Sequence, residues 1–374
     1  MTGLIEPLPA GPLPAGVGAV LVVDTGAIIA NWNLLRARHP GGAVAGVVKA
    51  NAYGLGATIV APALHGAGCR HFFTAHLTEA LAIRALVPGA MIAVLNGLSP
   101  DAASVFAAYD ITPVLGSLSE IAAWGAAARQ LGRKLPALLH IDTGMARLGL
   151  DAAELARLAG APELLAGIDL RFVMTHLVAS ERPEDPLNAL QRARFATACA
   201  MLPAAPRSLA NSSGIFLGAE FISDLARAGA ALYGINPMPG EKNPMRPVAR
   251  LQARVIQVRE IAAHAPVGYD ATWRAARPSR IATVALGYAD GWPFRLSGQG
   301  AAIFDGAPVP LVGRVSMDLT TYDVTDHPAI QAESWLEVIG PNLPPERIAE
   351  QAGTTPYEIL TSLGARIVRL ARAA

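Results

Sequence analysis

A chain of 374 residues is too long for one ordinary hydrophobic core, so two domains are expected. Its 30 Lys and Arg residues nearly cancel its 29 Asp and Glu residues, which excludes a basic surface for nucleic acid and an acidic interaction tail. The two cysteines, Cys69 and Cys199, are too few for a disulfide framework or a cysteine-ligated metal site, and they are typical of a reduced cytoplasm.

The first 16 residues contain Glu6 but no Lys or Arg, so they lack the basic region of a signal peptide. Val17–Val23 is apolar, but it is interrupted by Gly18 and ends at Asp24, which gives it the length of a strand and not of a membrane span. We therefore expect a soluble, cytoplasmic protein. From Asp24 onward the apolar residues recur at helical spacing.

The next apolar run, Ala43–Val48, has the length and valine content of a buried strand, and it ends at Lys49. A loop containing Gly54 and Gly56 follows. An amine at the edge of a core is partly desolvated, and this lowers its pKa as a Schiff-base lysine requires. Taken alone, a lysine in this position is more often a solvated residue at a strand end.

Short apolar runs then alternate with segments of helical character such as Ser117–Leu131 and Asp151–Leu158. Eight alternating units in roughly 220 residues predict an α/β fold, a (β/α)8 TIM-type barrel, in preference to an open sheet. The seven runs that follow Ala43–Val48 are His71–Thr74, Met91–Leu95, Thr112–Leu115, Ala137–Ile141, Leu170–Thr175, Arg207–Ala210 and Leu225–Leu232.

Beyond Pro237–Gly240 the pattern changes to strands separated by prolines and glycines, with little helical periodicity before Pro344–Ala352. We therefore expect a barrel in residues 25–240 and a mainly β domain made of residues 1–24 and 241–374. Strands of the second domain are expected at Val248–Glu260, Arg280–Ala285, Ala307–Leu311 and Thr320–Val324.

Reacting groups of a barrel lie at the C-terminal ends of its strands. Polar residues follow the predicted strands at these places, and a phosphate is expected beside the last two strands, where Ser212 and the Gly229–Ala230 backbone suit it. Alone, the string Asn211–Gly214 is more often a helix-capping turn. The other polar positions are Lys49, Asp142 to Arg147, His176 and Arg227.

The string V-V-K-A-N-A-Y-G-L-G around Lys49 resembles the pyridoxal-phosphate lysine motif of the alanine racemase family. Further strings are similar to that family in its own order, so the resemblance covers both predicted domains. They are Ile141–Gly149, Met174–His176, Arg227–Gly234, Gly287–Trp292, Gly313–Asp318 and Pro356–Glu358.

The resemblance implies that Lys49 holds pyridoxal 5'-phosphate through a Schiff base and is the base on one face of the substrate Cα. It also implies that Arg227 faces the pyridine nitrogen and keeps it unprotonated, since a guanidinium does not readily give up a proton. His176 is expected to support Arg227. The implied phosphate and cofactor contacts are Tyr53, Asn211, Ser212, Gly229, Ala230 and Tyr357.

The resemblance further implies a homodimer with shared active sites, in which Tyr269 of the β domain is the second base for the other subunit. A tyrosine with a pKa near 10 needs a cationic setting to act as a base at pH 7. Arg147 and the Met317 amide are the implied contacts of the substrate carboxylate. The implied entrance residues are Glu181, Tyr288, Arg295 and Arg314, and no metal is expected.

The chain departs from the family at three places. Ser316 stands where cysteine is common. After His176 the family more usually has alanine at the position of Val178 and aspartate at the position of Glu181. His140 stands where the family often has a carbamylated lysine whose anionic oxygens hold the active-site arginine. Arg147 is then expected to be oriented by a neutral His140, by a bound anion such as chloride or by a neighbouring polar side chain. The alternative is that His140 only packs structurally.

The function that these residues favour is alanine racemisation by two-base proton transfer. The family resemblance adds the supply of D-alanine as a peptidoglycan precursor of the cell wall. A racemase of broader amino-acid range would use the same machinery. A non-catalytic pyridoxal-phosphate carrier needs no Tyr269, and a decarboxylase would pair the pyridine nitrogen with an acid in place of Arg227.

Overall fold

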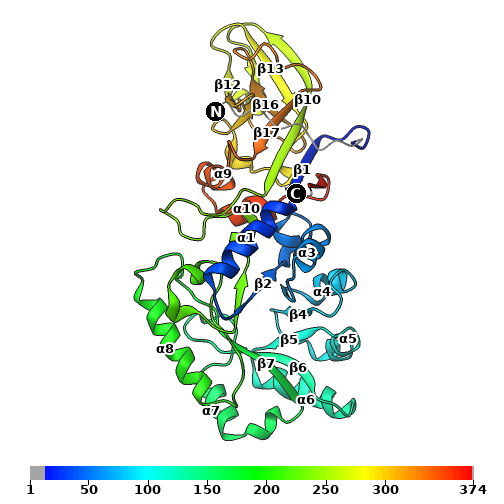
Figure 1. Ribbon diagram of the computed structural model, residues 1–374. Coiled ribbons are helices and arrows are strands. Elements are labelled where there is room, and N and C mark those ends of the chain that lie inside the picture. The colour runs from blue at the N-terminus through cyan, green and yellow to red at the C-terminus, as the bar shows by residue number, and fades with distance from the viewer. Residues whose placement is uncertain (1–12, 373–374) are drawn as a thin grey trace.

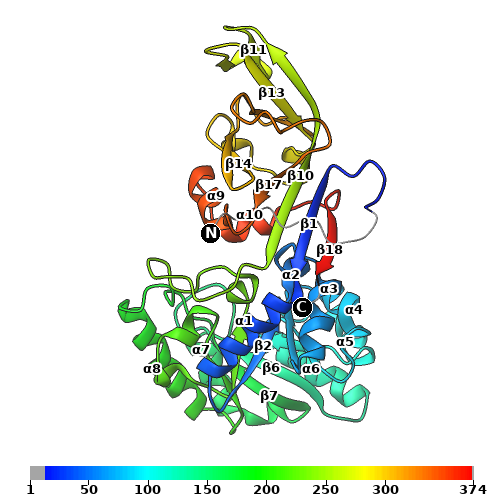
Figure 2. The ribbon, with the colours of Figure 1, turned by 45° about the horizontal axis from the view of Figure 1, so that its top comes forward.

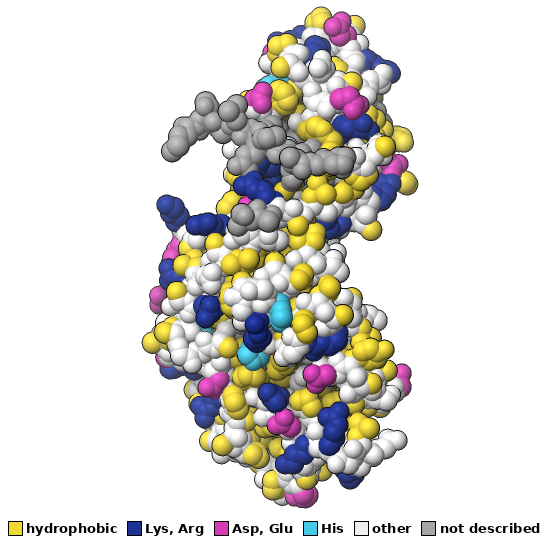
Figure 3. Space-filling view, turned by 45° about the vertical axis from the view of Figure 1, so that its right-hand side comes forward, with side chains coloured by type: hydrophobic (Ala, Val, Ile, Leu, Met, Phe, Trp, Pro, Cys, Tyr) yellow, Lys and Arg dark blue, Asp and Glu magenta, His cyan; other side chains and the backbone are white. Residues whose placement is uncertain are grey.

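The computed structural model describes residues 13–372. Residues 1–12 and 373–374 lie outside this range, so most of the segment expected to lack a signal peptide falls outside the described residues. Two bodies are stacked end to end, a barrel surrounded by helices and a β domain (Figure 1). No helix within residues 13–372 is both long and apolar enough to cross a membrane. Basic and acidic side chains are interspersed over the face of both bodies in Figure 3.

Eight parallel strands form the barrel, in the order β8-β7-β6-β5-β4-β3-β2-β9. An isolated parallel bridge between Asn211 and Arg227 brings the two end strands together, and the Arg227 amide donates to the Ala210 carbonyl at 2.9 Å. The predicted eight-stranded barrel is therefore confirmed. Its strands are β2 (Ala43–Val47), β3 (His71–Thr74), β4 (Met91–Val94), β5 (Thr112–Leu115), β6 (Leu135–His140), β7 (Ile168–Met174), β8 (Arg207–Ser208) and β9 (Leu225–Ala228).

Helices surround the barrel (Figure 2), and side-chain caps begin several of them. Asp24 accepts from the Ala27 amide at 2.7 Å at the start of α1, and Ser117 and Asp151 cap α6 and α7 in the same way. The helices of this ring are α1 (Thr25–Arg38), α3 (Ala57–Gly66), α4 (Leu77–Arg84), α5 (Ala103–Ala108), α6 (Leu118–Gln130), α7 (Ala152–Gly160) and α8 (Pro186–Ala200).

Alternate residues of the strands fill the inside of the barrel with apolar side chains, among them Ala45, Val47, Phe73 and Leu138. The opposite faces of the strands pack against the helices. The last strand is shorter than predicted. It ends at Ala228 because Gly229 leaves the strand conformation (φ −122°, ψ −95°), and a 3-10 helix, η5 (Ala230–Tyr233), follows.

The second body is a mixed sheet in the order β15-β14-β17-β10-β1-β18, and β13 pairs with both β10 and β16. Strand β1 (Ala19–Asp24) runs antiparallel to the long β10 (Ala249–Ile261) and parallel to β18 (Val368–Arg372). The remaining elements are β11 (Pro266–Val267), β12 (Trp273–Arg274), β13 (Ser279–Val284), β14 (Ala301–Phe304), β15 (Ala307–Pro310), β16 (Thr320–Asp323), β17 (Trp335–Ile339), α9 (Pro345–Ala352) and α10 (Pro356–Thr361).

Candidate active site

Lys49 lies two residues after the end of β2, at the C-terminal end of the barrel. The chain then makes a short left-handed helical turn, α2 (Lys49–Tyr53), in which Ala50, Asn51 and Ala52 have φ between 51° and 54° and ψ between 47° and 53°. Left-handed geometry costs roughly 1–2 kcal/mol for each such residue. Strain of this kind persists only where the surroundings enforce it, and it concentrates at functional sites.

Glu79 of α4 enforces this turn. Its carboxylate accepts from the Ala50 amide at 2.6 Å and from the amides of Ala75 and His76 at 2.8 and 3.1 Å. The charged acceptor therefore ties the turn after Lys49 to the start of the neighbouring helix. Sequence reasoning missed Glu79, and the only available signal was a glutamate in the first turn of a helix after a barrel strand.

The strand ends surround one cavity of about 610 Å3. It gathers residues from at least five separate segments of the barrel and one residue, Tyr357, from α10. The predicted site residues that line it are Lys49, Tyr53, His140, Arg147, His176, Glu181, Asn211, Ser212, Arg227, Gly229, Ala230 and Tyr357.

The pKa of Lys49 is lowered. Burial desolvates the ammonium, and the positive charges of Arg147 and Arg227 add to the effect, whereas Glu79 opposes it. A larger fraction of this amine is therefore neutral and nucleophilic than for a solvated lysine. This fits an amine that forms a covalent bond to a carbonyl carbon and accepts a proton.

Arg227 is 4% exposed, and no carboxylate within residues 13–372 forms an ion pair with it. Its Nη1 donates to the Ser208 carbonyl and hydroxyl at 2.9 and 2.6 Å, and its Nη2 donates to the Thr175 carbonyl at 2.5 Å. Burial lowers its pKa to about 10, so it remains cationic at neutral pH. In the described part of the chain the Nε–H has no acceptor, which leaves one donor for a ligand.

His176 and His140 are both kept neutral beside this cation. Burial, followed by the charge of Arg227, lowers the pKa of His176 to about 3 and that of His140 to about 4. Nδ1 of His176 lies 3.3 Å from Nη2 of Arg227. A guanidinium can only donate, so this nitrogen is the acceptor and the proton of the neutral ring is on Nε2.

The Ser212 hydroxyl has its proton available to a ligand in the cavity. Its Oγ accepts from the amides of Gly229 and Ala231 at 2.9 and 3.3 Å, so its own proton points elsewhere. The Gly229 amide, which we expected to contact the phosphate, donates to this serine in the structure. A Cβ at position 229 would lie 2.5 Å from the Tyr53 hydroxyl, so only glycine allows this close approach.

Tyr53 and Tyr357 place two hydroxyl groups beside this cradle. The Tyr53 ring stacks on Tyr233 with centroids 4.7 Å apart and lies 6.5 Å from the Tyr357 ring. Burial raises the pKa of Tyr53 to about 12, so its hydroxyl remains protonated and can donate. The Tyr357 hydroxyl donates to Glu181 at 2.7 Å.

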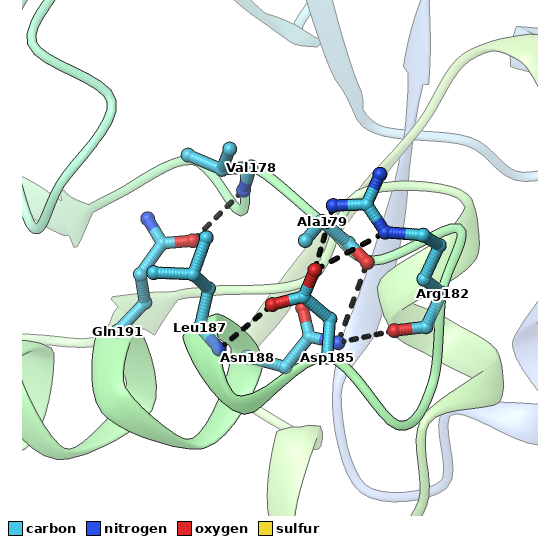
Figure 4. Close-up of polar contacts among 7 residues, drawn as sticks. All are labelled: Val178, Ala179, Arg182, Asp185, Leu187, Asn188 and Gln191. Carbon is cyan, nitrogen blue, oxygen red and sulfur yellow. Dashed lines mark hydrogen bonds and ion pairs between the residues drawn. The ribbon is translucent and has the colours of Figure 1, made fainter.

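Glu181 lies on the loop of residues 175–185, which joins β7 to α8. The first turns of α8 hold this loop (Figure 4), because the Val178 amide donates to Gln191 at 2.8 Å and Asn188 donates to the Arg182 carbonyl at 2.9 Å. At the same helix start, Asp185 accepts from Arg182 and from the Leu187 amide.

Arg147 lies on the loop after β6. The Asp142 carboxylate accepts from the amides of Gly144, Met145 and Ala146 at 2.8, 2.9 and 3.0 Å, which fixes this loop. Burial raises the pKa of Asp142, but these three bonds outweigh it and the net shift is downward. The Arg147 side chain is exposed, and no hydrogen bond joins it to His140 or to any other described residue.

The remaining predicted site residues lie apart from the cavity, in the β domain. Tyr269 is 70% exposed, Met317 is 54% exposed and Tyr288 is exposed as well. Arg314 pairs with Asp270, the residue after Tyr269, and lies over the Phe294 ring. Arg295 borders a different pocket beside Ala352 and Gly353. A single subunit therefore does not bring Lys49 and Tyr269 into the same cavity.

Two family models match the chain. The model of the alanine racemase N-terminal domain matches residues 23–237, and that of the alanine racemase C-terminal domain matches residues 248–371. A relative from Acidiphilium cryptum, named alanine racemase, is 55% identical over 352 residues, which cover 94% of this chain and 98% of the relative. A relative from Mesorhizobium japonicum, named as a catabolic alanine racemase, is 48% identical over 358 residues, covering 95% and 93%.

Solved structures give the same match. The crystal structure of alanine racemase from Bartonella henselae with covalently bound pyridoxal phosphate has a TM-score of 0.91 and 42% sequence identity to this chain. The match covers 96% of this chain and 100% of that one.

Proposed function

This chain belongs to the alanine racemase family, and we propose that it interconverts L-alanine and D-alanine by moving a proton at Cα between two bases, Lys49 and the partner subunit's Tyr269. The observation that carries this proposal is the Lys49 amine of lowered pKa, which shares one cavity with the buried cation of Arg227 and the donor cradle around Ser212. The amine suits the aldehyde of one cofactor, the cation suits its pyridine nitrogen, and the hydrogen-bond donors suit its phosphate.

The cofactor is pyridoxal 5'-phosphate, and the residues present fit it. Lys49 would hold its aldehyde carbon, and the unpartnered Nε–H of Arg227 would meet the pyridine nitrogen. The phosphate would receive the Ser212 and Tyr53 hydroxyls and the Ala230 amide, with Asn211 beside them. The Tyr357 hydroxyl would join them by turning its proton from Glu181 to the phosphate. When bound, the cofactor withdraws electrons from the substrate Cα and makes its proton acidic.

Lys49 then needs only to accept and return the proton on one face of Cα. Its lowered pKa keeps the neutral and charged forms closer in free energy than in a solvated lysine, which favours reversible transfer. Arg227 remains charged and His176 accepts from it, so the pyridine nitrogen meets a donor and no carboxylate. Arg147, at the cavity wall, is placed to bind the substrate carboxylate.

The second base comes from a second copy of the chain in this proposal. Tyr269 and Met317 are exposed residues of the β domain that line no part of their own subunit's cavity. A homodimer that places this surface over the partner's cavity supplies a base for the opposite face and brings the Met317 amide to the substrate carboxylate. Tyr288, Arg295, Arg314 and Glu181 would surround the entrance to that shared site.

The domain boundaries of this proposal are residues 25–240 for the cofactor-binding barrel and residues 1–24 with 241–374 for the domain that reaches the partner. The pairing of β1 with β10 and β18 supports the assignment of the N-terminal strand to the second domain. We place the enzyme in the cytoplasm, where the free thiols of Cys69 and Cys199 are stable, and propose that its D-alanine serves cell-wall peptidoglycan.

A chiral assay tests the proposed activity. Purified protein loaded with pyridoxal 5'-phosphate should convert L-alanine to an equal mixture of both enantiomers, and D-alanine should give the same mixture. Serine, valine and lysine, assayed in parallel, should react more slowly because the family's substrate is the smallest of the four. Faster racemisation of any of these would replace alanine as the proposed substrate, and no racemisation at all would refute the proposal.

A further inference from the structure

The turn of residues 362–367 joins α10 to β18 and lies between the Lys49 loop and the surface that carries Met317. Two glycines with left-handed φ allow the chain to pack this closely. A Cβ at Gly54 (φ 82°) would lie 2.0 Å from the Leu360 carbonyl oxygen, and one at Gly291 (φ 88°) would lie 1.9 Å from the Ser362 carbonyl oxygen. The end of α10, through Leu360, and the turn that follows it, through Ser362, are therefore in contact with the two functional regions of the subunit.

Arg366, on this turn, contacts the Met317 side. Its Nε donates to Asp290 Oδ1 and its Nη1 donates to Asp318 Oδ1, both at 2.8 Å. Asp290 is buried, and its other carboxylate oxygen accepts from the Gly287 amide at 2.9 Å. One guanidinium thus joins Asp318, the residue after Met317, to a short 3-10 helix, η7 (Tyr288–Asp290). The bond from the Gly287 amide to Asp290 also fixes this helix at its start.

Backbone hydrogen bonds from η7 and within the turn itself hold the Met317 segment in position. The amides of Tyr288 and Ala289 donate to the carbonyls of Ser316 and Met317 at 3.0 and 2.9 Å, so η7 supports the turn from one side. Within the turn, the Ser316 amide donates to the Leu319 carbonyl at 2.9 Å. The Met317 amide, at the apex, has no acceptor within residues 13–372 and is free to bind a carboxylate.

Arg369, three residues later, contacts the opposite side. Its Nε donates to the Gly54 carbonyl at 2.7 Å, at the end of the turn that follows Lys49, and its other nitrogens donate to carbonyls of residues 363, 364 and 367. Arg366 and Arg369 therefore extend from one segment toward two different active sites of the proposed dimer. Arg369 faces the site of its own subunit, and Arg366 faces the surface offered to the partner.

We propose that Arg366 is a positioning residue for the racemisation: it holds the Met317 amide at the place where it binds the substrate carboxylate in the partner's site. The inference rests on the proposed sharing of active sites between subunits. Its consequence is asymmetric, because loss of Arg366 weakens substrate binding in the partner and spares the site of the subunit that carries the change.

Mixed dimers test this asymmetry. One subunit carries Tyr269→Phe and supplies the working Lys49, and the other carries Lys49→Ala and supplies the working Tyr269 and Met317. Such a dimer has one intact site. Adding Arg366→Gln to the Lys49→Ala subunit should raise KM for alanine about tenfold with a small change in kcat, the pattern of a lost substrate contact. The same change in the Tyr269→Phe subunit should raise KM by less than twofold.

Two matched variants complete the test. Arg366→Lys should raise KM by a smaller factor than Arg366→Gln, because an ammonium can still contact one of the two carboxylates. Arg369→Gln should affect the site of its own subunit: it should lower cofactor affinity when it is placed in the Tyr269→Phe subunit, which supplies Lys49, and not when it is placed in the other. Hydrogen exchange in the homodimers gives a readout independent of turnover: Arg366→Gln should speed exchange in residues 316–319, and Arg369→Gln in residues 49–56.

These experiments distinguish the positioning role of Arg366 from the sharing of active sites on which it rests. If mixed dimers without an Arg366 change recover no activity, shared sites are refuted, and the inference is refuted with them. If they recover activity but Arg366→Gln changes KM equally in both placements, or in neither, only the positioning role of Arg366 is refuted. Unaltered exchange in residues 316–319 would refute it as well.

Discussion

Nη2 of Arg227 lies 3.3 Å from Nδ1 of His176, and burial lowers the pKa of both groups. The two effects have different consequences, because a pKa of about 10 leaves the arginine charged whereas a pKa of about 3 leaves the histidine neutral at pH 7. A neutral acceptor beside a buried cation orients the guanidinium without removing its charge. In the proposed function, the cofactor would therefore meet a fixed positive donor at its pyridine nitrogen.

The covalent attachment of the cofactor is the first prediction. The chain contains three lysines, Lys49, Lys134 and Lys242, and only Lys49 lines the cavity. Borohydride reduction of the loaded enzyme should fix a pyridoxyl group on the peptide that contains Lys49, detected by mass spectrometry. The peptides with Lys134 and Lys242 are internal controls, and a label on either of them in place of Lys49 would overturn the assignment.

Arg227 is expected to suppress transamination. In Arg227→Glu a carboxylate would let the pyridine nitrogen hold a proton, the cofactor would withdraw electrons more strongly and negative charge at Cα would persist longer. The ratio of transamination to racemisation should rise by about tenfold or more in a variant that still binds cofactor. Arg227→Lys retains the cation and is the control. An unchanged ratio in Arg227→Glu would contradict the role given to this arginine.

Glu79 gives a prediction that sequence reasoning could not have made. Its charge raises the pKa of Lys49, and its carboxylate holds the Ala50 amide at 2.6 Å. In Glu79→Gln the Lys49 amine of the apoenzyme should titrate at a lower pH, and cofactor affinity should fall about tenfold as a charge-assisted hydrogen bond is lost.

The rate of Lys49 modification as a function of pH measures the first effect, and equilibrium dialysis of pyridoxal phosphate measures the second. Glu154→Gln is the matched control, because Glu154 also accepts from a backbone amide, that of Leu118, at 3.1 Å. If Glu79→Gln and Glu154→Gln behave alike, Glu79 is only a helix-end residue.

Local sequence patterns predicted the barrel and most of the cavity because both depend on periodicity. Lys49, His140 and Arg227 lie within two residues of the ends of β2, β6 and β9, so the barrel brings their side chains to one rim, and this follows from the fold alone. The strand predicted at Leu225–Leu232 was too long, since an apolar run does not reveal that Gly229 leaves the strand to approach Tyr53. The periodicity of apolar residues therefore did not reveal where β9 ends.

Contacts between residues far apart in the chain could not be predicted from the sequence. Nothing in Ala50-Asn51-Ala52 indicates a left-handed turn, because the preference of these residues is overridden by Glu79 29 positions away. The contacts of Arg366 with Asp290 and Asp318 likewise join segments separated by 76 and 48 positions. Helix α8 and strands β17 and β18 were also not predicted, and their assignment depends on their tertiary neighbours.

His140 gives the last prediction. Carbamylation needs a lysine amine, so activity of this enzyme should not depend on bicarbonate. Burial and the charge of Arg227 lower the pKa of His140 to about 4, below the value of about 6.5 for an unfolded chain. Between these values the unfolded chain binds more protons at this position than the folded one. The contribution of His140 to stability is therefore fully present above pH 6.5 and is lost as the pH falls toward 4. The imidazole remains a neutral acceptor, available to a ligand or to Arg147, throughout the neutral range.

Comparison of His140→Ala with His140→Lys, each with and without bicarbonate, decides whether this acceptor matters. If a neutral His140 helps to orient Arg147, His140→Ala should lower kcat/KM for alanine about tenfold at pH 7 to 8, where the free energy of unfolding is not limiting. His140→Lys should recover activity only when bicarbonate is added, because the carbamylated amine supplies the anionic oxygens that a free ammonium lacks. Unchanged kcat/KM in His140→Ala would show that the histidine only packs at the end of β6 and that Arg147 takes its orientation from the substrate.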